Sequence, residues 1–438
     1  MSLREWIGNA QATAQVNTWT FGGTWETTDI VTVTINGKTL TVVVGVTAAA
    51  DVAAAVQVAL AASTIPEISE ITWTIDTATI TGTGQDDGTP FVCTFATADN
   101  GGAADSQTIE GGTSSTGTAA TVGTGPNYAD NTANWLGGAL PVDGDDIVIR
   151  RPISILYSLD GLDDVTPATL RVYSEFWASN ATIGLPEIHG SGANAYVEYR
   201  DRFLKFLGAT LAEIGIGESK SGSSILNLDF MTGITAATVH RTPQSADSSR
   251  PALCLVINPG TVSNGTLEVI SGSVGVGWYN EPCKVVPKIG YRDNQAADST
   301  VFFGPNVTMG ATFEQSGGIV EINSSTTVIT KTGGTLTING GSHPTVYNYE
   351  GQLFYNSTGT LAGTAGTVVG GKGEFYLTQD MSPKTVTNAF QLSAGAILDD
   401  SHGRVQSGGV PSLAWKTINC RQGDVDVRTP PNRTVTVS

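Results

Sequence analysis

The fold of this chain is decided by a phrase that recurs five times, as SGGIVEI at 316–322, TGGTLTI at 332–338, YEGQLFY at 349–355, GKGEFYL at 371–377 and SAGAILD at 393–399. In each copy a glycine precedes a strand-like triplet, and these glycines are Gly318, Gly334, Gly351, Gly373 and Gly395. Consecutive glycines in this series are 16, 17, 22 and 22 residues apart. A second strand-like run lies between copies, and an earlier copy, SNGTLEV at 263–269, carries Gly265.

The repeating unit therefore reads as turn, strand, turn, strand, which is typical of the coils of a parallel β-helix. One coil of this length cannot bury its inward side chains alone, but stacked coils pair each strand with its neighbours and bury a common apolar column. Glycine fits the corners, where the backbone needs a positive φ. The alternative is an antiparallel sandwich, which predicts hairpins every 8–12 residues without a coil-length register.

The N-terminal part of the chain has a different pattern. Segments 29–35 and 38–44 alternate Thr with apolar residues around Asn36-Gly37, a strong hairpin signal. A helix is expected near residues 48–62, capped by Thr47, with Val52, Val56 and Leu60 facing a sheet. Further strands are expected at 71–76, 77–82 and 91–96. The overall expectation is mainly β: a small N-terminal α+β module followed by a parallel β-helix (solenoid).

A Gly/Ser/Thr stretch at residues 111–126 marks the clearest boundary in the chain. After it, Trp135 is expected to plug the open end of the solenoid, as the terminal repeat of any stacked array must be capped. Helix periodicity after the boundary is suggested only around Phe203–Ile214. The expected units are an N-terminal arm at 1–15, the α+β module at 16–112, a linker at 113–130, a capping and early solenoid region at 131–260, solenoid coils at 261–410 and a C-terminal segment at 411–438.

Composition excludes several classes of partner. The chain has 438 residues, of which 14% are charged, and a net charge of −18. Phosphates would repel so acidic a chain, so nucleic acid is not an expected partner. No apolar run of 18 residues and no signal peptide are present, which predicts synthesis in a host cytoplasm without a membrane span. Cys93, Cys254, Cys283 and Cys420 form no CxxC pair, so buried free thiols are expected, with a Cys254–Cys283 disulfide as the alternative.

Residues that could carry chemistry are sparse. None of the four histidines has a partner at metal-binding spacing, and no cofactor motif appears. Asp143, Asp145 and Asp146 could bind calcium, but turns also favour Asp. Carboxylates on neighbouring coils could form an acid pair for glycan cleavage, although a turn origin is the commoner explanation. These are Glu374, Asp380, Asp399 and Asp400. The prediction is a protein that is not an enzyme and has no cofactor and no metal.

Aromatic residues offer a different kind of site. In Phe354, Tyr355, Phe375 and Tyr376, strand alternation requires one residue of each pair to point outward, so a stripe on consecutive coils is a candidate subunit interface. For a wider set of aromatics, core packing or an inter-subunit seam is the simpler account, and a sugar-binding strip is the alternative. The aromatics in question are Trp278, Tyr279, Tyr291, Tyr347, Tyr349, Tyr355 and Tyr376.

Taken together, the Thr-rich module with NGKT and TAAADVAAAV, the Gly-rich link, the segment NW…GG..P..GDDIVI and the Gly-cornered coils resemble virion structural proteins of tailed bacteriophages. The resemblance lies in organisation and turn style, and it covers most of residues 16–410. It implies a β-helical surface component of the virion, either a capsid decoration (cement) protein or a fibre, that forms a homotrimer or lattice and contacts other virion proteins such as capsid. A host surface glycan is a further partner to consider. The alternatives are a tailspike polysaccharide depolymerase and a bacterial surface adhesin.

Overall fold

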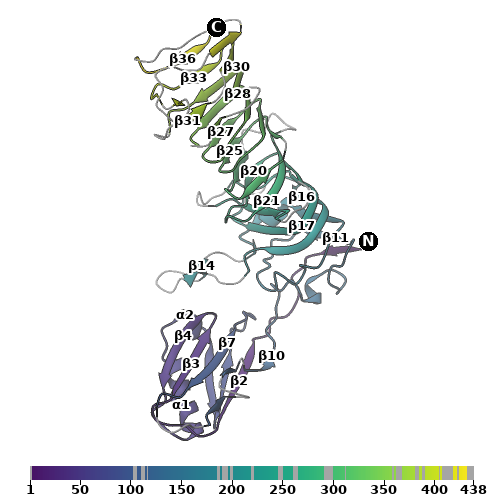
Figure 1. Cartoon of the computed structure of the whole chain (residues 1–438). Helices are drawn as coiled ribbons and strands as arrows, with labels where there is room; N and C mark the ends of the chain where they lie inside the picture. The colour runs from purple at the N-terminus through teal and green to yellow at the C-terminus, as the bar shows by residue number, and fades with distance from the viewer. Residues whose placement is uncertain are drawn as a thin grey trace.

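A computed structural model describes the chain from residue 2 to residue 431, except 102–105, 110–113, 116, 185–187, 190–195, 198–200, 219–220, 245–249, 260–264, 291–298, 311, 358–359, 362–366, 380–383, 387–389, 404, 407–417 and 422–423. The protein is mainly β, with a long stack of strands that leads to the C-terminus and a smaller module beside its N-terminal end (Figure 1).

The long stack is one 22-stranded sheet in which strand pairs run parallel. Most of its strands pair with the strand one coil away in sequence. The fold is therefore a parallel solenoid, and the antiparallel sandwich does not apply to this region. Its strands are β1 (Leu3–Glu5), β11 (Asp146–Ile149), β12 (Thr169–Tyr173), β13 (Thr182–Ile183), β16 (Leu204–Ile216), β17 (Ile225–Val239), β18 (Leu253–Ile257), β19 (Gly265–Val269), β20 (Gly272–Val276), β21 (Cys283–Ile289), β22 (Ser299–Phe303), β23 (Val307–Met309), β24 (Phe313–Gln315), β25 (Ile319–Ile322), β26 (Val328–Lys331), β27 (Thr335–Ile338), β28 (Thr345–Tyr355), β30 (Thr367–Tyr376), β32 (Phe390–Ser393), β33 (Ile397–Asp399), β35 (Ile418–Arg421) and β36 (Asp426–Arg428).

Two faces of the solenoid matter for function. We call face I the ladder of β20, β22, β25, β27, the second half of β28, the second half of β30, β33 and β36. Face II is the ladder of β19, β21, β24, β26 and the first halves of β28 and β30. Short strands lie outside the long sheet, namely β14 (Ile188–His189), β15 (Tyr196–Val197), β29 (Thr360–Leu361), β31 (Lys384–Val386) and β34 (Val405–Gln406).

Side chains alternate between the interior and solvent along each coil strand. On face I, Val320, Leu336 and Leu353 are fully buried and lie above one another. Such a column exists because the register places like positions of successive coils in contact. The apolar positions of the repeated phrase therefore form the core, as the sequence pattern predicts.

The corner glycines also stack. Gly318, Gly334 and Gly351 have φ of 71°, 73° and 80°. A Cβ on Gly334 would lie 2.3 Å from the carbonyl oxygen of Gly318, so the close approach of coils requires glycine as well as the turn. Gly373 continues the column beside Gly351. Gly395 does not, because the register of β30 with β33 places Ala396 beside Gly373.

A buried polar column lines the same corner from inside. Gln315, Lys331 and Asn348 each lie three residues before a corner glycine, pair in register and are at most 1% exposed. The Gln315 amide donates to the carbonyls of Gly317, Gly318 and Thr335 at 3.0–3.2 Å. These side chains thus satisfy turn carbonyls that strand pairing leaves over, which offsets the cost of burying them.

The N-terminal end of the solenoid is closed by residues from two distant segments. β1 pairs with β11, which makes residues 3–5 the first strand of the long sheet instead of part of a separate arm. Trp6 and Trp135 are buried against each other, with ring centroids 5.1 Å apart in an edge-on arrangement. Trp135 therefore lies at the solenoid end, where the sequence predicts a plug. Two 3-10 turns, at Thr132–Asn134 and Ser174–Ala178, belong to this end of the solenoid.

The smaller module is inserted between β1 and β11. Thr13 and Thr124 exchange two backbone hydrogen bonds of 2.8 and 3.1 Å, so the chain enters and leaves the module side by side. We call residues 13–124 the inserted module. Its elements are β2 (Val16–Gly22), β3 (Ile30–Ile35), β4 (Lys38–Val43), α1 (Ala49–Ala61), α2 (Pro66–Ser69), β5 (Thr72–Asp76), β6 (Thr79–Thr83), β7 (Cys93–Ala98), β8 (Thr108–Ile109), β9 (Ser114–Ser115) and β10 (Thr118–Thr121).

The inserted module has two antiparallel sheets that share one core. One sheet has the order β10-β2-β6-β5, with β8 on β2, and the other has the order β4-β3-β7-β9. The predicted hairpin is present, with φ of 50° at Asn36 and 85° at Gly37. Helix α1 contacts β2, β4, β5 and β6, and it buries Val52, Val56 and Leu60 as expected.

Three expectations about local structure are wrong. Thr47 does not cap α1, because the N-cap is Ala48, which offers no side-chain hydrogen bond. Residues 203–214 are not helical, since β16 covers nearly all of them and pairs with both β12 and β17. The Gly/Ser/Thr stretch is not wholly a linker either, because β9 and β10 add to the edges of the module's sheets. Small β-compatible residues suit an edge strand as well as a loop.

Candidate binding surface on the solenoid

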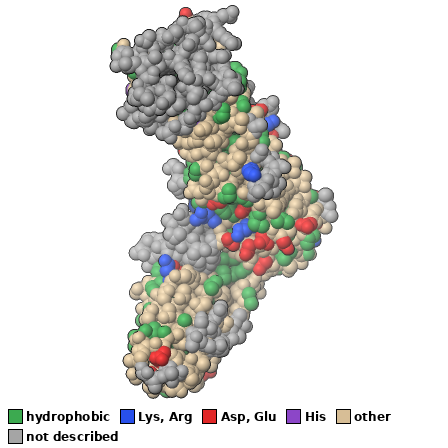
Figure 2. Space-filling model, viewed as in Figure 1, with side chains coloured by type: hydrophobic (Ala, Val, Ile, Leu, Met, Phe, Trp, Pro, Cys, Tyr) green, Lys and Arg blue, Asp and Glu red, His purple; other side chains and the backbone are tan. Residues whose placement is uncertain are grey.

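The outward side chains of face I form two rows that run along the solenoid. Thr300, Ile319, Thr335, Gln352 and Glu374 follow one another in the first row. The second row holds Phe302, Glu321, Thr337, Phe354 and Tyr376. Most of the side chains are neutral, and Figure 2 shows the same character over much of the described surface on the side in view. Aromatic rings interrupt the second row at two places, which are the two candidate surfaces.

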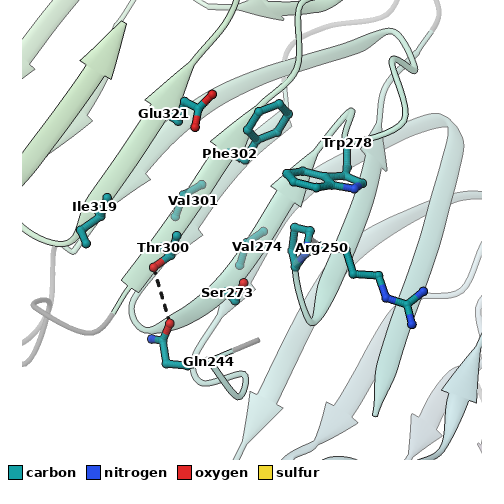
Figure 3. Close-up of a pocket in the computed structure, with 11 residues that line it drawn as sticks. Gln244, Arg250, Ser273, Val274, Trp278, Thr300, Val301, Phe302, Ile319 and Glu321 are labelled. Atoms are coloured by element: carbon teal, nitrogen blue, oxygen red, sulfur yellow. Dashed lines mark hydrogen bonds between the residues drawn. The ribbon is translucent and has the colours of Figure 1, made fainter. Parts of the chain in front are cut away.

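The first surface is a hollow of about 460 Å³ on the early coils of face I (Figure 3). Its wall is formed by Trp278 and Phe302, whose ring centroids are 4.5 Å apart at an interplanar angle of 71°. Both rings are half-buried, so each keeps part of its surface open to solvent. We call this site the hollow. Its lining comprises Gln244, Arg250, Pro251, Ser273, Val274, Trp278, Thr300, Val301, Phe302, Ile319 and Glu321.

The position of Trp278 depends on a glycine in the neighbouring strand. Gly275 pairs with Phe302 and points outward from face I. A Cβ at Gly275 would lie 2.7 Å from Cγ of Pro251 and 3.0 Å from Cβ of Trp278. Because Gly275 has no side chain, the indole and the proline can pack directly on the strand. A Cβ at this position would be too close to both and would displace them.

Polar groups surround the aromatic wall. The Thr300 hydroxyl lies 3.5 Å from Oε1 of Gln244 across the floor of the hollow. Glu321 is held from the far side, because the amides of Asn323 and Asn339 donate to its Oε1 at 3.2 and 2.8 Å. A side chain fixed in this way is ready to accept hydrogen bonds from a ligand without losing further freedom.

The second surface contains the predicted aromatic pairs. Phe354 and Tyr376 point outward and stack with centroids 5.0 Å apart and planes 19° apart. Tyr355 and Phe375 are fully buried and belong to the core, so two of the four candidate interface residues face solvent in one chain and two do not. The Tyr376 hydroxyl donates to Oε2 of Glu374 at 2.9 Å. The exposed stack covers two coils, because Thr337 precedes Phe354 in the row.

The candidate acid pair lies on the same face. Glu374 lies two residues before Tyr376 on the same side of β30, and Tyr376 pairs with Asp399 on the next coil. Arg428 contacts Asp399 at 3.5 Å. Burial would raise the pKa of Asp399, but hydrogen bonds from Ser401 and the Arg428 guanidinium outweigh it and hold that pKa below its usual range. Asp399 therefore stays ionised at neutral pH and cannot donate a proton. Asp400 is fully buried, and Asp380 lies outside the described residues.

The three aspartates considered for calcium have protein partners. Asp145 is 2% exposed and accepts from the Ser2 backbone nitrogen at 2.8 Å and from Arg4 at 3.1 Å. Burial opposes the charged form, yet these bonds keep the pKa of Asp145 lowered. Asp143 and Asp146 accept from Thr166 and Thr169, one coil away. Among the described residues no group of three or more His, Cys, Asp or Glu side chains is arranged to hold a metal ion. These acids tie β1 and neighbouring turns to the first coils.

The remaining aromatic candidates do not form one strip. Tyr347 and Tyr349 stack with centroids 6.1 Å apart beside the corner that joins face II to face I, and Tyr349 is 44% exposed. Tyr279 lies beneath the Arg202 guanidinium, 4.0 Å from its ring centroid. Tyr291 falls outside the described residues. The sequence thus named Trp278 but did not identify its partner Phe302. The sequence signal that could have indicated this site is Gly275, because a strand glycine leaves room for a neighbouring ring to pack over it, as Trp278 does.

The described cysteine side chains are thiols. Cys93, Cys254 and Cys283 are buried and unpaired with one another, so the alternative Cys254–Cys283 disulfide is not formed. Burial raises the pKa of the Cys254 and Cys283 thiols to about 12, which makes them poor nucleophiles. The Cys420 side chain lies outside the described part of the chain.

Comparison with known proteins gives no relative: no family model, no curated protein and no solved structure matches this chain. Over the described residues, the helices are too short or too polar to cross a membrane. The class that fold and surface define is therefore a parallel β-solenoid that carries an inserted α+β module and an aromatic-lined face.

Proposed function

We propose that this chain is a non-catalytic structural protein on the surface of a tailed-bacteriophage virion, either a capsid decoration protein or a fibre component. The observation that carries the proposal is the single 22-stranded ladder, closed at one end by Trp6 and Trp135 and joined there to the inserted module. A stack in which each coil supports the next is a stiff spacer, and the inserted module is available to attach it.

Surface composition supports a role in an assembly. The chain carries 62 Asp, Glu, Lys and Arg residues in 438, and eight of the ten outward residues in the two rows of face I are neutral. Neutral polar surfaces lose less hydration on contact with a copy of themselves than charged surfaces do. On the early coils, opposite charges pair across neighbouring strands, as between Arg171 of β12 and Glu213 of β16, whose charged atoms are 3.2 Å apart.

The outward stack of Phe354 and Tyr376 supports association of copies of the chain through face I. An aromatic pair that is half open to solvent in one chain would be covered when equivalent faces meet around an axis. We propose a homotrimer for the assembled form. Light scattering on the purified protein should give three chain masses, and Phe354→Ser with Tyr376→Ser should shift the mass toward one chain. A wild-type mass of one chain at micromolar concentration would contradict the trimer.

The alternative of a glycan-cleaving tailspike rests on the neighbouring carboxylates Glu374 and Asp399. Hydrolysis needs one carboxyl group that is protonated while the other is ionised. Asp399 is tied to Arg428 and ionised, and Glu374 already accepts hydrogen bonds from Tyr376 and Gln352. Both groups therefore serve the surface network of face I, which favours the structural role.

Location on the particle can be tested directly. Particles are purified on two successive density gradients from cells that produce this chain, and each fraction is analysed by peptide mass spectrometry. We expect the chain to sediment with the major capsid protein in a constant ratio. A chain that stays at the top of the gradient while particles sediment would refute a virion role.

A further inference from the structure

The hollow on face I combines two features that rarely meet on a surface otherwise built for packing. Trp278 and Phe302 present partly open rings in an edge-on arrangement, and Thr300, Gln244 and Glu321 present oxygen and nitrogen atoms around them (Figure 3). Sites for small molecules have this composition, with an apolar surface and a few placed polar groups. At about 460 Å³ the hollow is within the usual range for such sites.

We propose that the hollow binds a neutral saccharide. A pyranose ring has one face of C–H bonds, which packs against an aromatic ring, and a rim of hydroxyls, which needs donors and acceptors at the side. The Trp278 ring supplies the first surface. The Thr300 hydroxyl, the Gln244 amide and the Glu321 carboxylate supply the second.

The charge around the hollow selects a neutral sugar over an acidic one. Glu321 lies at the edge of the hollow and is fixed by Asn323 and Asn339, so it would repel a sialic or uronic acid. Arg250 would be the natural counterion, but its guanidinium is engaged with Tyr279 and is turned away from Thr300 and Glu321 (Figure 3). The net charge of −18 acts in the same direction.

The side chains of the hollow are also preorganised, which is not expected of a surface depression without a ligand. Trp278 is seated by the missing side chain at Gly275 and by Pro251, and Glu321 is clamped by two amides. Little side-chain freedom remains to be lost on binding. The hollow opens to solvent and holds one or two sugar units, so each site should bind weakly, and repeated copies on an assembly would strengthen attachment to a glycan surface.

The probes for the test are neutral tetrasaccharides of glucose, galactose, mannose and N-acetylglucosamine, with sialyllactose as the acidic control. Saturation-transfer NMR on the full-length protein identifies a ligand, and calorimetry gives its Kd. We expect at least one neutral tetrasaccharide to bind, and sialyllactose to bind at least tenfold more weakly. No transfer to any neutral probe at millimolar concentration would overturn the proposal, and so would tighter binding of sialyllactose.

Variants then locate the site. Trp278→Ala should weaken binding of the neutral ligand at least tenfold. Because Trp278 also packs on Gly275, a second variant, Thr300→Trp, fills the floor from an exposed strand position without removing core atoms. The matched control is Tyr349→Ala, which removes an exposed aromatic ring on a later coil, outside both the hollow and the proposed subunit interface. If Thr300→Trp binds the sugar as wild type does, or if Tyr349→Ala loses binding equally, the hollow is not the site.

This inference does not rest on a virion location. A chain that sediments with particles but ignores every sugar would refute only the saccharide site, and a sugar-binding chain absent from particles would refute only the virion role.

Discussion

Replacing Lys331 with methionine should change how the stability of the solenoid depends on pH. Lys331 is fully buried at the corner between face II and face I, where its ammonium group donates to the Glu350 carbonyl oxygen at 2.5 Å and to Asn348 Oδ1 at 3.3 Å. Burial lowers its pKa from 10.5 to about 7, against the opposing attraction of Glu350 and Glu374. Methionine keeps the length of the side chain and removes the titrating group.

The sign follows from proton binding in the two states. Between pH 7 and pH 10.5 the unfolded chain keeps the Lys331 proton while the folded chain releases it, so stability rises with pH in this window. Each pKa unit corresponds to about 1.4 kcal/mol. From pH 7 to pH 9.5 the wild type should therefore gain about 3 kcal/mol from this residue, and Lys331→Met should gain none of it.

The assay is urea unfolding of both proteins at half-unit steps from pH 6 to pH 9.5. We expect the stability of Lys331→Met minus that of wild type to be constant below pH 7 and to fall by about 3 kcal/mol toward pH 9.5. Lys284→Met, which removes a half-exposed lysine from the outer side of β21, is the control and should follow the wild-type curve. Parallel curves for wild type and Lys331→Met across the whole range would refute the account of the buried column.

Three further changes test other parts of the fold. Gly334→Ala should lower the free energy of unfolding in urea by at least about 2 kcal/mol more than Gly37→Ala does. Both glycines have positive φ, but only at Gly334 would the new Cβ have another atom within 4 Å. Equal losses of stability in the two variants would contradict the stacked corner. Trp135→Ala should destabilise the solenoid by about 3–5 kcal/mol in thermal unfolding, and a loss below about 1 kcal/mol would show that the end needs no plug. His343 is fully buried and burial lowers its pKa from 6.5 to about 4, so stability should fall by about 3 kcal/mol as pH drops through that window. His343→Leu should remove this loss of stability at low pH. If the stability of the variant falls with pH as that of the wild type does, the imidazole is not buried in its neutral form.

The features that could be predicted from sequence are those encoded by neighbouring residues. The Asn36-Gly37 turn and the burial of Val52, Val56 and Leu60 follow from local geometry and period. The corner glycines repeat at coil length, so the sequence also predicts their stacking. The register shift at Gly395 was not visible, because coil lengths alone do not say which corner absorbs an extra residue.

The features that were missed depend on contacts between distant residues. Pairing of β1 with β11 joins segments about 140 residues apart, and three-residue strands carry too little pattern to reveal their partners. Residues 203–214 show apolar spacing that fits a helix, yet pairing on both sides makes them part of β16. Lys331 has the composition of a surface residue, and only the carbonyl groups inside the corner explain its burial.

Of the two candidate surfaces, one could be predicted in part from the sequence and the other could not. Strand alternation predicts that one residue of each aromatic pair points outward, and Phe354 and Tyr376 do so. The hollow was not predictable as a unit, because it brings together Gln244, Trp278, Thr300 and Glu321 from four separate segments. Its assembly depends on the stacking register of successive coils.

The most direct test of the virion role is electron microscopy of particles made with and without this chain. Particles from cells that carry an intact coding sequence should display an elongated density that antibodies to the chain label. Particles from cells with that sequence deleted should lack this density while the capsid and tail remain. Identical particles from the two sources, with no labelling, would contradict the account.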